Sequence, residues 1–65
     1  MEDLVARAIR AYIKWQKKQG GLIIQPGNGS YIDENEEIVL TNVNGELARY
    51  RYNEETDRLI PVKVK

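Results

Sequence analysis

The stretch from Asp3 to Gln19 constrains this chain most, because it is the one segment with a long helical repeat of apolar residues. At 100° per residue its apolar side chains fall in one sector, and basic side chains occupy the opposite sector. The apolar members are Leu4, Val5, Ala8, Ala11, Tyr12 and Trp15, with Ile9 and Ile13 at one side. Asp3 is suited to the N-cap, and Gly20 to the position that ends a helix. We therefore predict an amphipathic helix over residues 3–19 that packs on a sheet.

Trp15 is the largest side chain of this helix and lies near the centre of its apolar arc. We expect it to be largely buried between the helix and the sheet. On that placement, Trp15→Ala costs about 3–5 kcal/mol, the usual range for a large aromatic residue removed from a core.

After Gly20 the sequence changes to short apolar and β-branched runs separated by turn residues. These runs predict strands at about residues 21–25, 30–33, 37–43, 46–52 and 58–64. Pro61 cannot donate a ladder hydrogen bond, so we expect the last strand at an edge. The whole chain, residues 1–65, is thus predicted to be a single small α+β domain. Its one N-terminal helix packs on an antiparallel β-meander of four to five short strands.

The register of the central hairpin depends on its turn. Asn44-Gly45 is the strongest two-residue type I′ signal, and a loop of these two residues sets Val39 opposite Tyr50. One face of the sheet then carries Val39, Thr41, Val43, Ala48, Tyr50 and Tyr52, and the other carries Ile38, Leu40, Leu47, Arg49 and Arg51. Neither face is cleanly polar, and the aromatic residues favour the first face as the one that meets the helix. A longer loop would change the pairing register and leave these two sets unchanged.

The composition offers few ways to stabilise a domain of this size. The chain has 65 residues with no cysteine and no histidine, so it has no disulfide and lacks the commonest metal ligand. One helix can cover only one of the two partly apolar faces of the sheet. We therefore expect a homodimer, in which the second copy covers a candidate dimer face and each arginine reaches an acidic residue across the interface. That face consists of Ile38, Leu40, Leu47, Arg49 and Arg51.

Candidates for chemistry are weak. The chain has one serine, Ser30, so a nucleophile and its base would have to be improvised, and we expect no enzyme and no catalytic residue. The acidic run at residues 33–37 begins like a calcium loop, but Ile38 stands where such a loop needs glycine and Asn44 where it needs glutamate. The turn at residues 26–30 could cradle a phosphate, yet a strand follows it rather than the helix that such sites require. We predict no metal and no cofactor.

Two features bear on nucleic-acid binding. Residues 1–21 carry a net charge of +3 and residues 22–65 a net charge of −3, which disfavours wholesale binding but leaves a local basic patch. The candidate binding surface is the basic face of the helix: Arg7, Arg10, Lys14, Lys17 and Lys18. Tyr50 and Tyr52 would stack bases if they were exposed, whereas burial argues that they cover the core, which is the interpretation we favour.

These features favour a small non-enzymatic binding module that acts by protein–protein contact, including self-association. The alternative is a nucleic-acid-binding protein that uses the basic face of the helix. The sequence shows neither a signal peptide nor an apolar run of membrane length, so we expect a cytoplasmic protein that does not associate with membranes.

Overall fold

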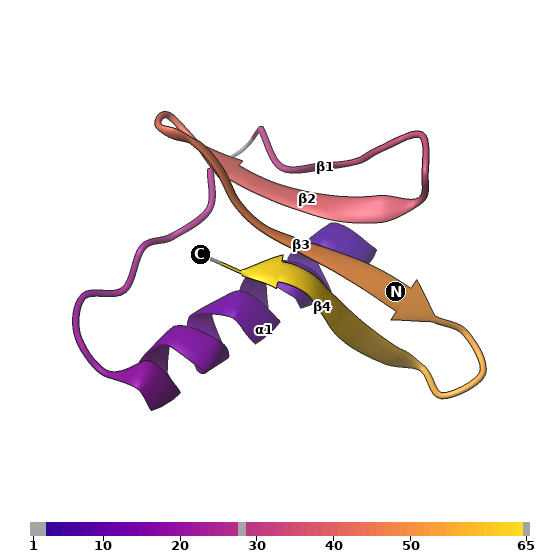
Figure 1. The fold of residues 1–65 in the computed structure, drawn as a ribbon, viewed down its shortest axis with the longest axis horizontal. Helices are drawn as coiled ribbons and strands as arrows, with labels where there is room; N and C mark the ends of the chain where they lie inside the picture. The colour runs from indigo at the N-terminus through magenta and orange to yellow at the C-terminus, as the bar shows by residue number, and fades with distance from the viewer. Residues whose placement is uncertain (1–2, 28, 65) are drawn as a thin grey trace.

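A computed structural model of the chain describes residues 3–27 and 29–64. Helix α1 (Leu4–Gln19) packs against a sheet of four antiparallel strands: β1 (Tyr31–Ile32), β2 (Glu37–Asn42), β3 (Gly45–Asn53) and β4 (Arg58–Val64). The strands lie in the order β1-β2-β3-β4, so the sheet is a simple meander (Figure 1). The predicted α+β fold, with one N-terminal helix on an antiparallel meander, is confirmed.

The ends of α1 follow the sequence signals. The carboxylate of Asp3 accepts the N–H of Ala6 at 2.8 Å, which satisfies one of the donors that a helix start leaves unpaired. At the other end Gly20 takes a positive φ of 78°, and its N–H donates to the carbonyl of Gln16 at 3.1 Å. The predicted boundaries of the helix are therefore correct to within one residue.

The predicted first strand is absent from the sheet. Residues 21–25 run outside it, between α1 and β1 (Figure 1). The backbone of Ile24 is hydrogen-bonded to the side chain of Gln16 rather than to another strand, through two bonds of 2.8 Å. The prediction of a strand at residues 21–25 was wrong because apolar, β-branched composition does not reveal whether another strand is available to pair.

The register of the central hairpin also differs from the prediction. Asn42 pairs with Gly45, so the loop residues are Val43 and Asn44. Asn44 lacks the positive φ that a type I′ turn needs, and Gly45 has it instead, at 118°. A register shift follows between residues 40 and 41, and Leu47 is the extra residue that lacks a direct partner.

This shift changes which residues share a face. Leu40 pairs with Ala48 and Ile38 pairs with Tyr50, so these four side chains lie together beneath α1. The buried core cluster consists of Ala8, Tyr12, Ile38, Leu40, Ala48 and Tyr50. The helix therefore covers Ala48 and Tyr50, as predicted, but together with Ile38 and Leu40 of β2 rather than Val39 and Val43. Val43 is fully exposed.

Trp15 is 37% exposed, so the prediction that it is largely buried was wrong. The buried positions of α1 recur every fourth residue at Ala8, Tyr12 and Gln16, and Trp15 lies beside this line. Its ring stacks on that of Tyr12, with centroids 6.0 Å apart and planes at 14°. Trp15 thus shields the edge of the core rather than filling it.

Candidate binding surfaces

The five basic residues of the helix do not form one uniform patch. Arg7 donates to the carboxylate of Asp57 at 3.0 Å and to its carbonyl at 3.1 Å, and its guanidinium lies 5.5 Å from the centroid of the Tyr52 ring. Arg7 therefore ties the helix to the β3–β4 turn. Lys14, Lys17, Lys18 and Arg10 are exposed.

The contact of Arg7 with the β3–β4 turn is a small electrostatic network. The hydroxyl of Tyr52 donates to the same Asp57 oxygen at 2.6 Å. These two donors, Tyr52 first and then Arg7, hold the pKa of Asp57 below its ordinary value, while the carboxylate raises the pKa values of both Tyr52 and Arg7. Asp57 has a positive φ of 52°, a conformation that aspartate tolerates better than most residues.

A shallow hollow of about 400 Å³ lies between α1 and the start of β4. Four basic side chains line it, those of Arg7, Arg10, Lys14 and Arg58, together with the carboxylate of Asp57. Arg58 is the basic residue that sequence reasoning missed, because it lies 39 positions along the chain from the last residue of the helix. Four other hollows among the described residues are each lined by at most one basic residue, so this hollow is more basic than any of them.

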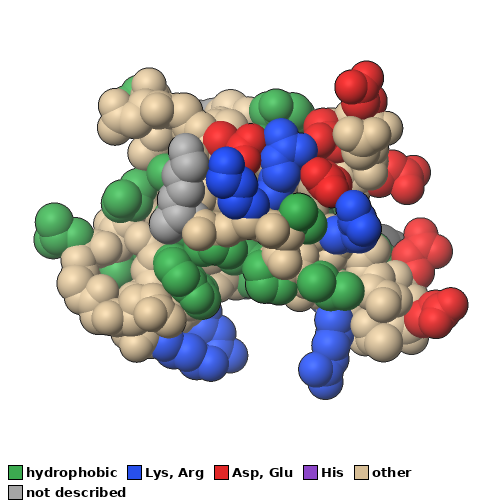
Figure 2. Space-filling view, viewed as in Figure 1, with side chains coloured by type: hydrophobic (Ala, Val, Ile, Leu, Met, Phe, Trp, Pro, Cys, Tyr) green, Lys and Arg blue, Asp and Glu red, His purple; other side chains and the backbone are tan. Residues whose placement is uncertain are grey.

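The opposite face of the sheet carries a second charged network. Arg49 contacts three carboxylates: Asp33 at 2.8 Å, Glu37 at 2.9 Å and Glu46 at 3.0 Å. Arg51 contacts Glu37 at 2.8 Å. Acidic and basic side chains are intermixed over β2 and β3 in Figure 2. Val39 pairs with Arg49 across these two strands and is only 1% exposed.

The pKa values of this network shift in the directions that mutual pairing demands. Arg49 and then Arg51 hold the pKa of Glu37 below its ordinary value. The backbone N–H of Glu37 is the largest cause of the lowered pKa of Asp33, and Glu46 followed by Glu37 raises the pKa of Arg49. The network is thus satisfied within a single chain.

The predicted dimer face of Ile38, Leu40, Leu47, Arg49 and Arg51 does not exist as one surface. Ile38 and Leu40 have no exposed area, and Leu47 packs against the same core cluster. Arg49 and Arg51 lie on the other face and bind acidic residues of their own chain. The expectation that Ile38, Leu40 and Leu47 remain in water was wrong, because the shift at residues 40–41 turns them toward the helix.

The two tyrosines in the Arg-Tyr repeat of β3, Tyr50 and Tyr52, belong to the core, which is the interpretation that the sequence favoured. Tyr50 is 4% exposed, and burial raises its pKa. Tyr52 packs against the core cluster and is half-buried. These two rings therefore do not offer an open stacking platform.

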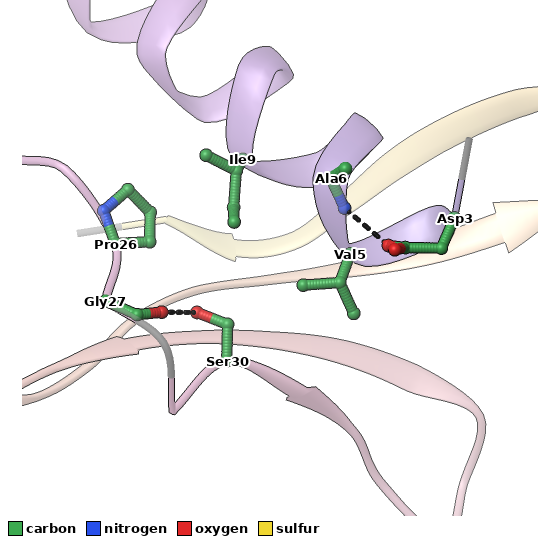
Figure 3. Close-up of a pocket in the computed structure, with 7 residues that line it drawn as sticks. All are labelled: Asp3, Val5, Ala6, Ile9, Pro26, Gly27 and Ser30. Atoms are coloured by element: carbon green, nitrogen blue, oxygen red, sulfur yellow. Dashed lines mark hydrogen bonds between the residues drawn. The ribbon is translucent and has the colours of Figure 1, made fainter.

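The turn at residues 26–30 lines a second hollow, of about 450 Å³, with the first half of α1 (Figure 3). Gly27 donates its N–H to the carbonyl of Thr41 at 2.7 Å, and Ser30 donates its N–H to Gly27 at 3.3 Å. The hydroxyl of Ser30 also donates to Gly27 and accepts the N–H of Thr41, both at 3.1 Å. These backbone donors are used within the fold, which does not favour a phosphate cradle. Asn28 lies outside the described residues.

The acidic run before β2 forms a turn held by its own backbone. One oxygen of Asp33 accepts the N–H groups of Asn35 and Glu37, both at 2.9 Å. Residues 3–27 and 29–64 contain no group of three or more acidic side chains arranged to bind a metal ion.

The apolar segment Leu22–Ile24 is the surface that sequence reasoning placed wrongly. Leu22 is 94% exposed, Ile23 43% and Ile24 46%. Gln16, which holds this segment, is 6% exposed despite its polar side chain. A glutamine in the buried sector of the helix was the available sequence signal, since a buried amide needs hydrogen-bond partners.

No protein-family model matches the chain, and no match was found among curated proteins or solved structures. Within the described residues, no helix has the length and apolar character needed to cross a membrane.

Proposed function

We propose that this protein is a small non-enzymatic binding module that acts by protein–protein contact and that it self-associates as a homodimer. The observation that carries this proposal is the exposure of the three consecutive large apolar residues Leu22, Ile23 and Ile24. Apolar area left in water costs about 25 cal/mol per Å² relative to burial, and contiguous apolar patches on small proteins commonly mark interaction sites.

The chemistry of the remaining side chains supports a binding role over catalysis. The chain has no histidine and no cysteine, and the hydroxyl of its one serine, Ser30, serves the packing of the turn against β2. Arg49 and the three carboxylates that it contacts neutralise one another on the face of the sheet opposite α1. This leaves the apolar segment as the surface that gains most from a partner.

Sedimentation equilibrium tests the proposal. At ~100 μM the parent is expected to be mostly dimeric, because a dimer with a Kd of ~10 μM, worth about 7 kcal/mol, is largely formed there. The double variant Leu22→Ser/Ile23→Ser is expected to be monomeric. Ile60→Ser is the matched control, since Ile60 is 46% exposed on β4, and it should remain dimeric. A parent that is monomeric at ~100 μM contradicts the proposal.

The second candidate function is nucleic-acid binding, which the basic hollow between α1 and β4 favours. Arg10, Lys14 and Arg58 line that hollow, and Lys17 and Lys18 are exposed further along the helix. Phosphate contacts give a steep salt dependence, so short single-stranded and duplex oligonucleotides should be titrated at ~50 and ~200 mM salt. Submicromolar, salt-sensitive binding that is lost in Arg10→Glu/Lys14→Glu would make nucleic acid the ligand. Weak binding that is unchanged by these substitutions would exclude it.

A further inference from the structure

The two hydrogen bonds between Gln16 and Ile24 define the conformation of the segment after α1. The amide nitrogen of Gln16 donates to the carbonyl of Ile24, and its oxygen accepts the N–H of the same residue, both at 2.8 Å. Only an extended residue points its N–H and C=O to one side, where a single amide can meet both. Gln16 therefore takes the place of one residue of a neighbouring strand, and Ile24 has the backbone conformation of a β-strand.

The backbone groups on either side of Ile24 face the other way. In an extended chain, successive residues direct their N–H and C=O groups to alternate sides, so those of Ile23 and Gln25 point away from Gln16. Neither residue makes a hydrogen bond with any part of the chain that the structure describes. Residues 22–25 thus form an extended segment outside the sheet, with one edge held by the helix and one edge open to solvent.

We propose that Leu22–Gln25 pairs in an antiparallel fashion with the same segment of a second copy, with Ile24 on the two-fold axis. This inference rests on the proposed self-association and identifies the surface that mediates it. It is a strand addition in which backbone hydrogen bonds join the two chains and the apolar side chains of the segment become covered.

The segment is its own complement. The two outward residues, Ile23 and Gln25, lie symmetrically about Ile24, so a reversed copy sets Ile23 of each chain opposite Gln25 of the other. Each such pair exchanges two N–H···O=C bonds, and both outward positions of both chains find partners. The segment contains no charged side chain that would meet its own kind across the axis.

The two edges of the sheet are less suited to this role. The pairing of β1 extends over only two residues, Tyr31 and Ile32. Strand β4 contains Pro61, which has no N–H to donate, and the exposed Lys63, a residue type that discourages edge pairing. The open edge of Leu22–Gln25 has neither obstacle.

Disulfide trapping tests the register directly, because the chain has no cysteine of its own. In the proposed dimer, residue 24 faces its counterpart as a non-hydrogen-bonded pair with Cα atoms about 4.5 Å apart, within the range that a disulfide spans. The matched control is Leu22→Cys. In the proposed dimer, residue 22 of one chain lies opposite residue 26 of the other, so the two cysteines are four residues, or roughly 13 Å, apart. Leu22 is also more exposed than Ile24, so random collision favours the control.

We expect Ile24→Cys to form a covalent dimer under mild oxidation at least ~10-fold faster than Leu22→Cys, since only its sulfur atoms are within bonding reach. Equal rates, or a faster reaction at Leu22→Cys, would overturn the strand pairing.

A second pair of variants probes the backbone. Ile23→Pro removes an outward N–H, whereas Leu22→Pro removes one on the same side as Gln16. We expect Ile23→Pro to raise the dimer Kd by roughly 10-fold or more and Leu22→Pro to change it by no more than about 2-fold, because only the first loses intermolecular hydrogen bonds. If the parent dimerises but the two proline variants change the dimer Kd equally, the proposed strand pairing is wrong and self-association through another surface remains. A parent that is monomeric at ~100 μM overturns both the surface and the proposed function.

Discussion

Leu40 and Val43 are apolar residues only three positions apart, yet the structure assigns them opposite roles. Leu40, on β2, has no exposed area, and Val43, in the turn that follows, is fully exposed. Replacing a buried leucine with alanine costs about 2–5 kcal/mol, through lost burial and the cavity left behind. Replacing an exposed valine with alanine changes the free energy of unfolding by no more than about 0.5 kcal/mol. We therefore predict that Leu40→Ala is strongly destabilising and Val43→Ala is nearly neutral.

Urea denaturation followed by circular dichroism measures this difference. The total stability of a 65-residue domain is about 3–10 kcal/mol, so Leu40→Ala could be largely unfolded even without denaturant. Ile38→Val is a milder core variant at a site with no exposed area, and its expected cost of about 0.5–1.5 kcal/mol keeps the fold intact. The register described here would be refuted if Val43→Ala proved as costly as Leu40→Ala, or if Ile38→Val had no measurable effect.

Three further predictions follow from individual contacts. Gln16→Leu should destabilise the fold by about 1–2 kcal/mol, the net worth of two hydrogen bonds, while Gln19→Leu at an exposed position of the same helix stays within about 0.5 kcal/mol in urea melts. Trp15→Ala should cost less than about 3 kcal/mol, because Trp15 is 37% exposed, and a loss of about 3–5 kcal/mol would show that it is buried after all. Because the folded-state pKa values of Asp57 and Glu37 are lowered, both residues stabilise the fold above the unfolded-state value of about 4, and this stability is lost as the pH falls through the folded-state pKa. Urea midpoints should therefore drop between about pH 7 and about pH 2, and by less in Asp57→Asn; an equal drop in that variant would contradict the role of Asp57.

The helix and most of the sheet could be predicted from the sequence because their signals are local. The cap residues Asp3 and Gly20 act within one turn of the helix, and the 3.6-residue repeat between them needs no knowledge of the partner surface. The three longer strands, β2, β3 and β4, were likewise located by their composition and by the turns that separate them. The edge position of β4 agrees with the Pro61 signal.

The assignment of sheet faces failed because a shift of one residue in a strand exchanges its two faces. The Asn44-Gly45 signal placed the turn one residue too late, and the irregularity after Leu40 then set Ile38 and Leu40 under the helix. The Asn-Gly pair predicts a tight turn, but it does not determine whether the two loop residues are 44–45 or 43–44. The predicted dimer face was wrong for the same reason, because it was derived from the predicted register of this hairpin.

The position of the segment after α1 could not be predicted for a different reason. Leu22–Gln25 has the composition of a strand, and its backbone is extended at Ile24, but its partner is the side chain of Gln16 rather than a strand. A contact of this kind depends on where the helix ends relative to the sheet. Local sequence patterns carry no information on that distance.

The most direct test of self-association through this segment is amide hydrogen exchange at single-residue resolution, measured by mass spectrometry on the parent at ~1 μM, below the expected Kd of ~10 μM, and at ~100 μM, where the dimer is mostly formed. The N–H of Ile24 should be protected at both concentrations, because Gln16 accepts it within the same chain. The N–H groups of Ile23 and Gln25 should gain protection only at the higher concentration, where the second copy supplies their acceptors. Exchange at Ile23 and Gln25 that is equally fast at both concentrations would contradict the account.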